Sequence, residues 1–145
     1  MAGSRIVDTK IIRLLALLAF ASIESGSAIA GCQSNITKKG NFFIGTSFST
    51  WDFISNVPQE LAYTRIYTKL AQEGWKIEQA DAKVGIISAS TQISFSGGHS
   101  APLNVIVQPK DGGSKITATL TVGGGQIATE PAADLCKMIG AAEVE

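Results

Sequence analysis

Residues 116–122 constrain the fold more than any other segment, because their alternation is regular and its two sets differ in chemistry. Ile116, Ala118, Leu120 and Val122 are apolar, whereas each residue between them is a threonine. Successive side chains of a β-strand point to opposite faces of the sheet, so the segment predicts a strand with one buried and one wet face. A sheet covered on both faces would bury the threonine hydroxyls, so we expect helices on one face only.

Four other segments have the patterns of strands. Residues 42–53 are rich in aromatic and β-branched residues, and residues 75–79, 86–95 and 103–108 alternate between apolar and polar. The Asp111-Gly112 pair before the last strand is a hairpin signal. Since long apolar edge strands recruit partners, we expect the edge near residues 42–51 to be able to accept a partner strand.

Two segments have the patterns of helices. Apolar residues recur at helical spacing over residues 62–71, after the start signal Pro58 and before the stop signal Gly74. A second helix is predicted from Pro131 to about Ala142. The element order β-α-β-β-β-β-α predicts an α+β fold, in which an antiparallel sheet of four to five strands has both helices packed on one face.

The first thirty residues have the pattern of a signal peptide. Residues 1–13 carry three basic residues against one acidic residue, a net charge of +2, and residues 14–23 form an apolar run. That run is shorter than the ~20 residues of a membrane-spanning helix. Ala28-Ile29-Ala30 is a small-x-small cleavage signal, so we expect export and cleavage after Ala30. The predicted organisation is a signal peptide (1–30), a polar lead-in (31–41), one α+β domain (42–142) and a frayed tail (143–145).

The two cysteines allow two interpretations. In an oxidising compartment, Cys32 and Cys136 are expected to form a disulfide in a periplasmic protein. Residues 29–32 (Ile-Ala-Gly-Cys) also resemble a bacterial lipobox, in which Cys32 would carry a lipid anchor at the outer membrane. Both interpretations predict export, and contact with a membrane is expected only if Cys32 is lipidated.

Composition argues against several classes of function. The chain has 12 Lys plus Arg and 12 Asp plus Glu, so no overall basic field exists to bind a nucleic acid. One histidine and two cysteines cannot build a multi-His or multi-Cys zinc site, and we expect no metal and no cofactor. His99, the one candidate base, lies in a predicted glycine-rich loop, so we expect no catalytic residues and no enzyme. The aspartates Asp52, Asp81, Asp111 and Asp134 are expected at turns or caps.

Gly74-Trp75 at the end of the first helix and residues 85–89 (Gly-Ile-Ile-Ser-Ala) resemble a group of small bacterial exported domains. Many of these are lipoproteins, with a helix-grip or BamC-like α+β shape, and the resemblance covers roughly residues 42–142. It implies a non-enzymatic interaction or structural role with an unknown partner in the envelope. The alternative is a carrier of a small apolar ligand, with a pocket between the first helix and the sheet. The aromatic residues that would line this pocket, or fill the core instead, are Tyr63, Tyr67, Trp75 and Phe95.

Overall fold

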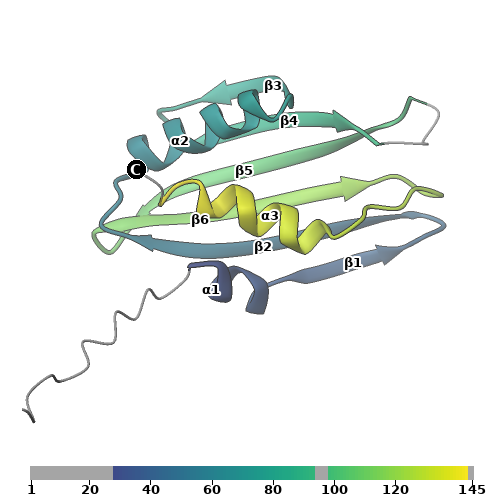
Figure 1. The fold of residues 1–145 in the computed structure, drawn as a ribbon, viewed down its shortest axis with the longest axis horizontal. Coiled ribbons are helices and arrows are strands. Elements are labelled where there is room, and N and C mark those ends of the chain that lie inside the picture. The colour runs from purple at the N-terminus through teal and green to yellow at the C-terminus, as the bar shows by residue number, and fades with distance from the viewer. Residues whose placement is uncertain (1–27, 94–97, 144–145) are drawn as a thin grey trace, which may run out of the picture.

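The computed structural model describes residues 28–93 and 98–143 of the 145-residue chain. These residues form one antiparallel sheet of six strands in the order β1-β2-β6-β5-β4-β3, together with three helices (Figure 1). The elements are, in chain order, α1 (Ala28–Ser34), β1 (Thr37–Asn41), β2 (Gly45–Ser55), α2 (Gln59–Gln72), β3 (Lys76–Asp81), β4 (Ile86–Gln92), β5 (Ser100–Lys110), β6 (Gly113–Val122) and α3 (Pro131–Gly140).

The helices α2 and α3 lie across one face of the sheet (Figure 1). The apolar set of β6 faces them and is buried, and the same holds for Leu103, Val105 and Val107 of β5. On the other face, the hydroxyls of Thr119 and Ser49 lie 2.9 Å apart and hydrogen-bond across β6 and β2. The predicted antiparallel α+β fold, with these two helices on one face, is therefore confirmed, whereas the helix α1 was not predicted.

The sheet has six strands, not the predicted four to five, because Thr37–Asn41 forms the edge strand β1. All five residues of β1 are exposed, so no apolar alternation marks this strand in the sequence. Its backbone pairs with β2, with Thr37 opposite Ser49 and Asn41 opposite Gly45. The segment predicted as a lead-in thus contains a strand and part of α1. Residues 45–49 are covered by β1, so the expected free edge at residues 42–51 is wrong.

The first predicted strand, residues 42–53, also begins too early. Residues 42–44 form the turn between β1 and β2, and β2 runs from Gly45 to Ser55. The side chain of Asn41 caps this turn, because its Oδ1 accepts hydrogen bonds from the backbone N–H groups of Phe43 (2.9 Å) and Ile44 (3.2 Å). Aromatic and β-branched composition indicated a strand here, but local hydrogen bonding makes a turn.

The turn and helix signals otherwise match the structure closely. Asp111 and Gly112 connect β5 and β6 with φ values of 45° and 77°, the conformation of a tight hairpin turn. Gly74, with a φ of 80°, follows the C-cap of α2. The last helix begins at the predicted Pro131 and ends at Gly140, two residues before the expected end.

The disulfide between Cys32 and Cys136 is present and confirms the predicted pairing. It joins α1 to α3, with 5.6 Å between the two Cα atoms. The backbone N–H of Cys32 donates a hydrogen bond of 2.9 Å to Oδ2 of Asp52, a buried residue in the middle of β2, so Asp52 is not at the expected turn or cap. A lipid thioether at Cys32 would need the same sulfur atom, so one molecule carries either the disulfide or the lipid.

Several predictions fall on residues outside the described ranges. These are residues 1–27 of the signal peptide, Phe95 of the proposed pocket and the last two residues of the tail. Cleavage after Ala30 therefore stays a prediction. Within residues 28–93 and 98–143, no helix is long and apolar enough to cross a membrane.

Candidate functional site

The two ends of the sheet differ, and the candidate site lies at one of them. The open end comprises the β1–β2 turn (42–44), the start of β5 at Ser100 and the β6–α3 loop (123–130). The closed end comprises the β3–β4 turn (82–85) and the β5–β6 turn (111–112). A cleft of about 990 Å³ lies in the open half of the molecule, between the helices and the sheet.

The floor of the cleft is apolar. Leu70 of α2 and Leu135 and Met138 of α3 form it together with Leu103 of β5 and Leu120 of β6. All five are buried in the core that joins the helices to the sheet. They lie there because the apolar stripe of each helix must cover the apolar face of the strands. A ligand in the cleft would therefore rest on the edge of the main hydrophobic core.

The walls of the cleft are more accessible than its floor. Trp75, which lies between α2 and β3, is partly buried, and Ile127 of the β6–α3 loop is largely exposed. The neighbouring Gln126 shapes this loop, since its Oε1 accepts a 3.0 Å hydrogen bond from the N–H of Gly123 and its own N–H donates to the Gly123 carbonyl. His99 lies on the same rim and is exposed. The rim thus mixes apolar and hydrogen-bonding groups above an apolar floor.

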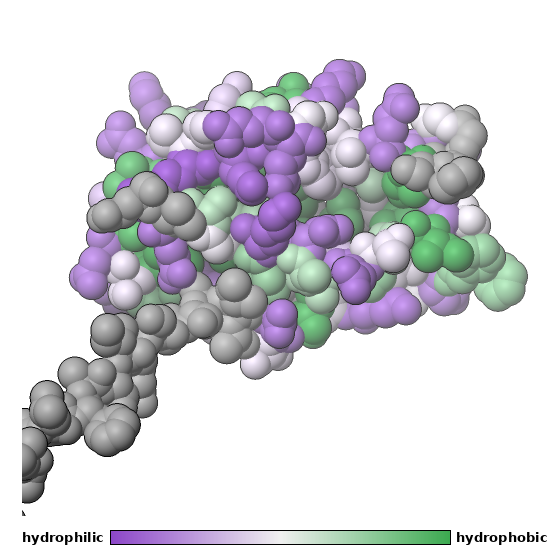
Figure 2. Space-filling model, in the orientation of Figure 1, coloured by the Kyte–Doolittle hydropathy of each residue, from purple (hydrophilic) through white to green (hydrophobic). Residues whose placement is uncertain are grey.

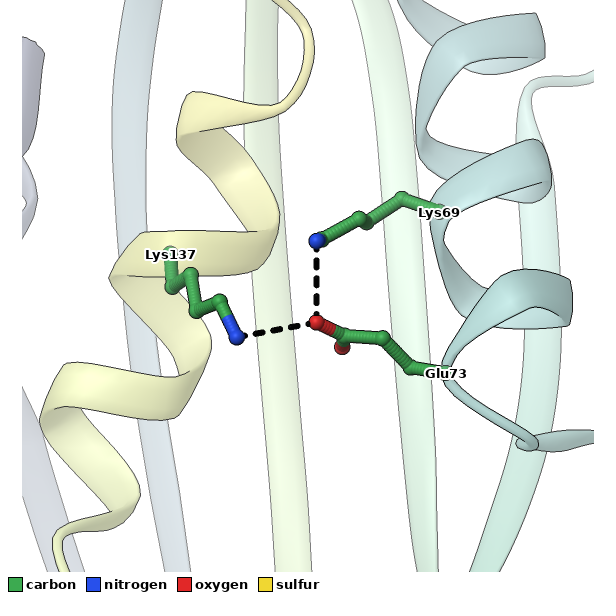
Figure 3. A network of polar contacts seen from close by, with 3 residues as sticks. All are labelled: Lys69, Glu73 and Lys137. Carbon is green, nitrogen blue, oxygen red and sulfur yellow. Dashed lines mark ion pairs between the residues drawn. The ribbon is translucent and has the colours of Figure 1, made fainter.

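A charged network crosses the gap between the two helices at the cleft. Glu73 at the end of α2 lies between Lys69 of the same helix and Lys137 of α3, with N–O distances of 3.0 Å to each (Figure 3). Partial burial by itself would raise the pKa of Glu73, but the hydrogen bonds and charges of the two lysines outweigh it, so the pKa lies below its ordinary value. The carboxylate is therefore held in its ionised form.

A second carboxyl group on the rim shows the opposite shift. Burial raises the pKa of Asp134, in the first turn of α3, and the charges of Glu130 and Glu73 add to this, while Lys137 opposes it. Glu73, Asp134 and Lys137 all line the cleft. The rim therefore offers a cation, an ionised carboxylate and a carboxyl group that holds its proton more tightly than usual.

A further contact fixes the two helices relative to each other outside the cleft. Nη1 of Arg65, on α2, donates a 2.8 Å hydrogen bond to the carbonyl oxygen of Ala142, just after α3. Together with the pair between Glu73 and Lys137, this contact connects the helices at two positions along α2. The width of the cleft is thus set by polar contacts as well as by the core.

Of the three predicted pocket residues that the structure describes, Trp75 alone lines this cleft. Tyr63 and Tyr67 stack on each other on α2, with ring centroids 6.4 Å apart, and neither lines it. Tyr63 is buried, and burial raises its pKa, with smaller contributions from Tyr67 and from Asp81 at the closed end. Phe95 lies outside the described residues.

Sequence reasoning missed the loop that forms one wall of the cleft. Residues 124–129 line the cleft. From the sequence, this glycine-rich segment is expected only to separate the last strand from the last helix. One signal was available, because Ile127 is a large apolar residue in a segment with no strand or helix partner for it. Single exposed apolar residues are common on protein surfaces, so Ile127 alone could not have identified this wall from the sequence.

Comparisons with known proteins identify no family. No family model matches the chain, and no curated protein matches it. Among solved structures, one match is the crystal structure of Ara h 8.0201, with 15% sequence identity and a TM-score of 0.39. The match covers 67% of this chain and 94% of that one. A likeness at this TM-score carries no argument about function, and the resemblance to small exported α+β domains stays a prediction.

Proposed function

We propose that this protein is an exported, non-enzymatic binding protein of the bacterial envelope that holds a small amphipathic ligand in the cleft between its helices and its sheet. The observation that carries the proposal is the division of the cleft into an apolar floor and a polar, charged rim. Such a division suits a ligand with an apolar body and one polar end. Of the two functions expected from the sequence, the carrier is the one that the cleft supports.

The size of the cleft also supports a ligand. Small-molecule sites typically have volumes of about 300–1,000 Å³, and the cleft is at the upper end of that range. The side chains of the floor expose little surface to the cleft. Most of the surface that a ligand could contact therefore comes from the walls, above all from Trp75 and Ile127. Aromatic and branched apolar walls suit an acyl chain or a ring system better than a sugar or a phosphate.

Binding without catalysis is proposed from the chemistry of the rim. A thiol nucleophile at Cys136 is not available to His99 while its sulfur forms the disulfide. Within the described residues, no three His, Cys, Asp or Glu side chains are grouped so that they could hold a metal ion. Glu73 pairs with Lys69 of its own helix and with Lys137 of α3, which suits a role in shaping the cleft.

The proposed location rests on the leader pattern and on the disulfide. A disulfide is most stable in an oxidising compartment such as the periplasm. Its stabilising effect would be lost in a reducing cytosol, so the fold and the predicted signal peptide agree in favouring export. A population lipidated at Cys32 would instead be anchored at the outer membrane.

The two tryptophans allow a direct test, because they lie on opposite faces of the sheet. Trp75 lines the cleft, whereas Trp51 lies on the outer face beneath the amine of Lys115, which is 4.6 Å from its ring centroid. The variant Trp51→Phe leaves only the cleft reporter, and Trp75→Phe leaves only the control. A dibrominated fatty acid, which quenches at contact range, should quench Trp75 saturably and leave Trp51 unchanged.

Two outcomes would contradict the proposal. Either no quenching of Trp75 occurs, or both tryptophans are quenched equally, as expected for non-specific adsorption. An interaction or structural role without a ligand would then be the better function. Mass analysis of small molecules extracted from the purified protein gives an independent check, since a bound lipid should copurify with the parent chain.

A further inference from the structure

The turn between β1 and β2 exposes three consecutive large apolar side chains. Phe42, Phe43 and Ile44 are 49%, 85% and 79% exposed, and they form what we call the apolar tip. Hydrophobic surface gathers at this end of the molecule, on the right in Figure 2. Single exposed apolar residues are normal on protein surfaces, but a contiguous group at the end of a hairpin indicates a surface that contacts something apolar.

Three backbone polar groups of the apolar tip are partnered within the protein. The N–H groups of Phe43 and Ile44 donate to Oδ1 of Asn41, and the carbonyl of Phe42 accepts a 2.7 Å hydrogen bond from the N–H of Gly125. An unpartnered backbone group is costly to move from water into an apolar medium. The tip is therefore built so that its side chains can leave water without stranding these groups.

The segment of chain that carries the apolar tip has charges of one sign. The segment 35–51, which contains the whole β1–β2 turn, carries Lys38 and Lys39 and no acidic residue, and residues 123–129 carry no charge. The nearest acidic residues along the chain are the buried Asp52 and Glu130 at the start of α3. By contrast, the closed end contains both signs, at Lys83 and Asp111 in the turns and at Asp81 and Lys110 in the strand ends beside them.

We propose that the apolar tip docks the protein on a lipid bilayer with anionic headgroups. The aromatic and aliphatic side chains of residues 42–44 enter the interface, and Lys38 and Lys39 contact the headgroups. The combination of an apolar projection with adjacent lysines, and with no carboxylate in the segment 35–51, is complementary to an anionic membrane surface. This docking needs neither a lipid on Cys32 nor a ligand in the cleft.

Docking through the apolar tip would also orient the cleft. Gly125, which holds the carbonyl of Phe42, belongs to the loop that forms one wall of the cleft. The tip and the cleft thus share the open end of the molecule. A protein that rests on the bilayer through this turn presents the cleft at the membrane surface, and its closed end faces away.

The test places a tryptophan at each end of the full chain. Phe43→Trp reports on the tip, and Val84→Trp is the matched control, because Val84 is also an exposed turn residue (57%) but lies at the closed end. Vesicles of phosphatidylcholine, with or without an equal amount of phosphatidylglycerol, carry brominated acyl chains. Quenching beyond that of the parent chain is expected for the tip variant only, and mainly with the anionic vesicles.

Measurements of vesicle binding, with the parent chain as reference, test how much each group of side chains contributes to partitioning. Replacing both lysines by glutamine should weaken partitioning to anionic vesicles roughly thirtyfold. Replacing Phe43 and Ile44 by serine should weaken it by at least about tenfold. Because all four side chains are exposed, the circular dichroism spectrum and the disulfide of each variant should match those of the parent.

The proposal is wrong if the tryptophan at position 43 is quenched no more than the one at position 84. This holds even if an uncleaved leader brings the chain to the vesicles, because the readout is specific to each end. A change of oligomeric state in the serine variants without any effect on vesicle quenching would assign the apolar tip to a second copy of the chain, and would also overturn the proposal. The cleft experiment is unaffected by either result.

Discussion

At the closed end of the sheet the connections are tied to the strands by hydrogen bonds, whereas at the open end apolar side chains and a cleft face outward. The N–H of Val107 donates to the carbonyl of Gly85, and Nε2 of Gln59 donates to the carbonyl of Val107, at 2.8 and 2.9 Å. The hydroxyl of Ser114 similarly donates a 2.7 Å hydrogen bond to the carbonyl of Val57. The loops there are therefore part of the fold's hydrogen-bonded framework.

The loops of the open end are also held by hydrogen bonds, but they leave apolar side chains exposed. The β6–α3 loop is fixed to the β1–β2 turn through Gly125 and to itself through Gln126, but it covers little of the apolar surface beside it. This contrast between the two ends indicates where a binding function lies in a chain without a recognisable motif. The end that closes on itself stabilises the fold, and the end that leaves apolar groups in water is the better candidate for binding.

The largest effect is expected from removing the disulfide. Changing Cys32 and Cys136 to alanine opens a connection between residues 104 positions apart, and the chain-entropy model gives a loss of about 4–5 kcal/mol in the free energy of unfolding. Because Cys136 fixes α3, which contributes Leu135 and Met138 to the floor of the cleft, backbone hydrogen exchange should increase more at the open end than at the closed end. Urea unfolding and hydrogen exchange measure the two effects.

Reduction of the parent chain is the control for this prediction, and it should reproduce the loss. Unfolding of the variant at the same urea concentration as the oxidised parent would contradict the disulfide. Intact mass of exported protein adds a separate check: a chain that starts at Gly31 should gain two hydrogens on reduction. A diacylglyceryl mass on Cys32 would show the lipidated form instead.

A pair of glycine substitutions tests whether the closed end is really the tighter one. Gly85 and Gly125 have nearly equal positive φ values, 80° and 78°. A Cβ at Gly85 would overlap the carbonyl oxygen of Val107, whereas a Cβ at Gly125 has nothing within 4 Å. We expect Gly85→Ala to cost at least about 3 kcal/mol, from strain plus overlap, and Gly125→Ala about 1 kcal/mol, from strain alone.

Thermal or urea unfolding of the two variants measures the difference directly. The two substitutions are matched in chemistry and in backbone conformation, so the difference reports on packing around each site. Equal losses would mean that the closed end relaxes as easily as the open end, and the contrast between them would then have no energetic basis.

The framework of the fold was predictable where periodicity and burial agree. Residues 116–122 alternate because one face meets the helices, and the structure buries the predicted set. The helix α2 was predictable from its apolar stripe and from Gly74. By contrast, β1 has no apolar residue, since it is held by backbone pairing at an edge, and pairing leaves no periodic signal in the sequence.

The candidate site was less predictable for the same physical reason. An apolar stripe fixes which face of a helix is buried, but not which end of the sheet that face reaches. Tyr63 and Tyr67 are on the predicted helix but away from the cleft, while Trp75 is at it. The wall formed by residues 124–129 depends on where a non-periodic loop packs, and only the three-dimensional structure gives that.

The smallest expected effect comes from the charged contact that crosses the cleft. Glu73→Gln removes the ionic attraction between α2 and Lys137. The side chains involved are one-third to two-thirds exposed, so the loss of stability at neutral pH should be below about 1 kcal/mol. Glu60→Gln, in the first turn of the same helix, is the matched control and should change less.

The pH dependence of the stability loss identifies this contact more clearly than the magnitude of the loss at neutral pH. The pKa of Glu73 is lowered in the folded protein, so its stabilisation is fully present above the unfolded pKa, about 4.3, and is lost as pH falls through the lower folded value. Asp134 acts in the opposite direction, since its raised pKa means that its ionisation costs stability, which returns as pH falls. Urea unfolding of the parent and of Glu73→Gln should therefore converge as the pH falls from the unfolded value through the lower folded one. A difference that is constant from neutral to acidic pH would mean that the ionised carboxylate does not hold the two helices together across the cleft.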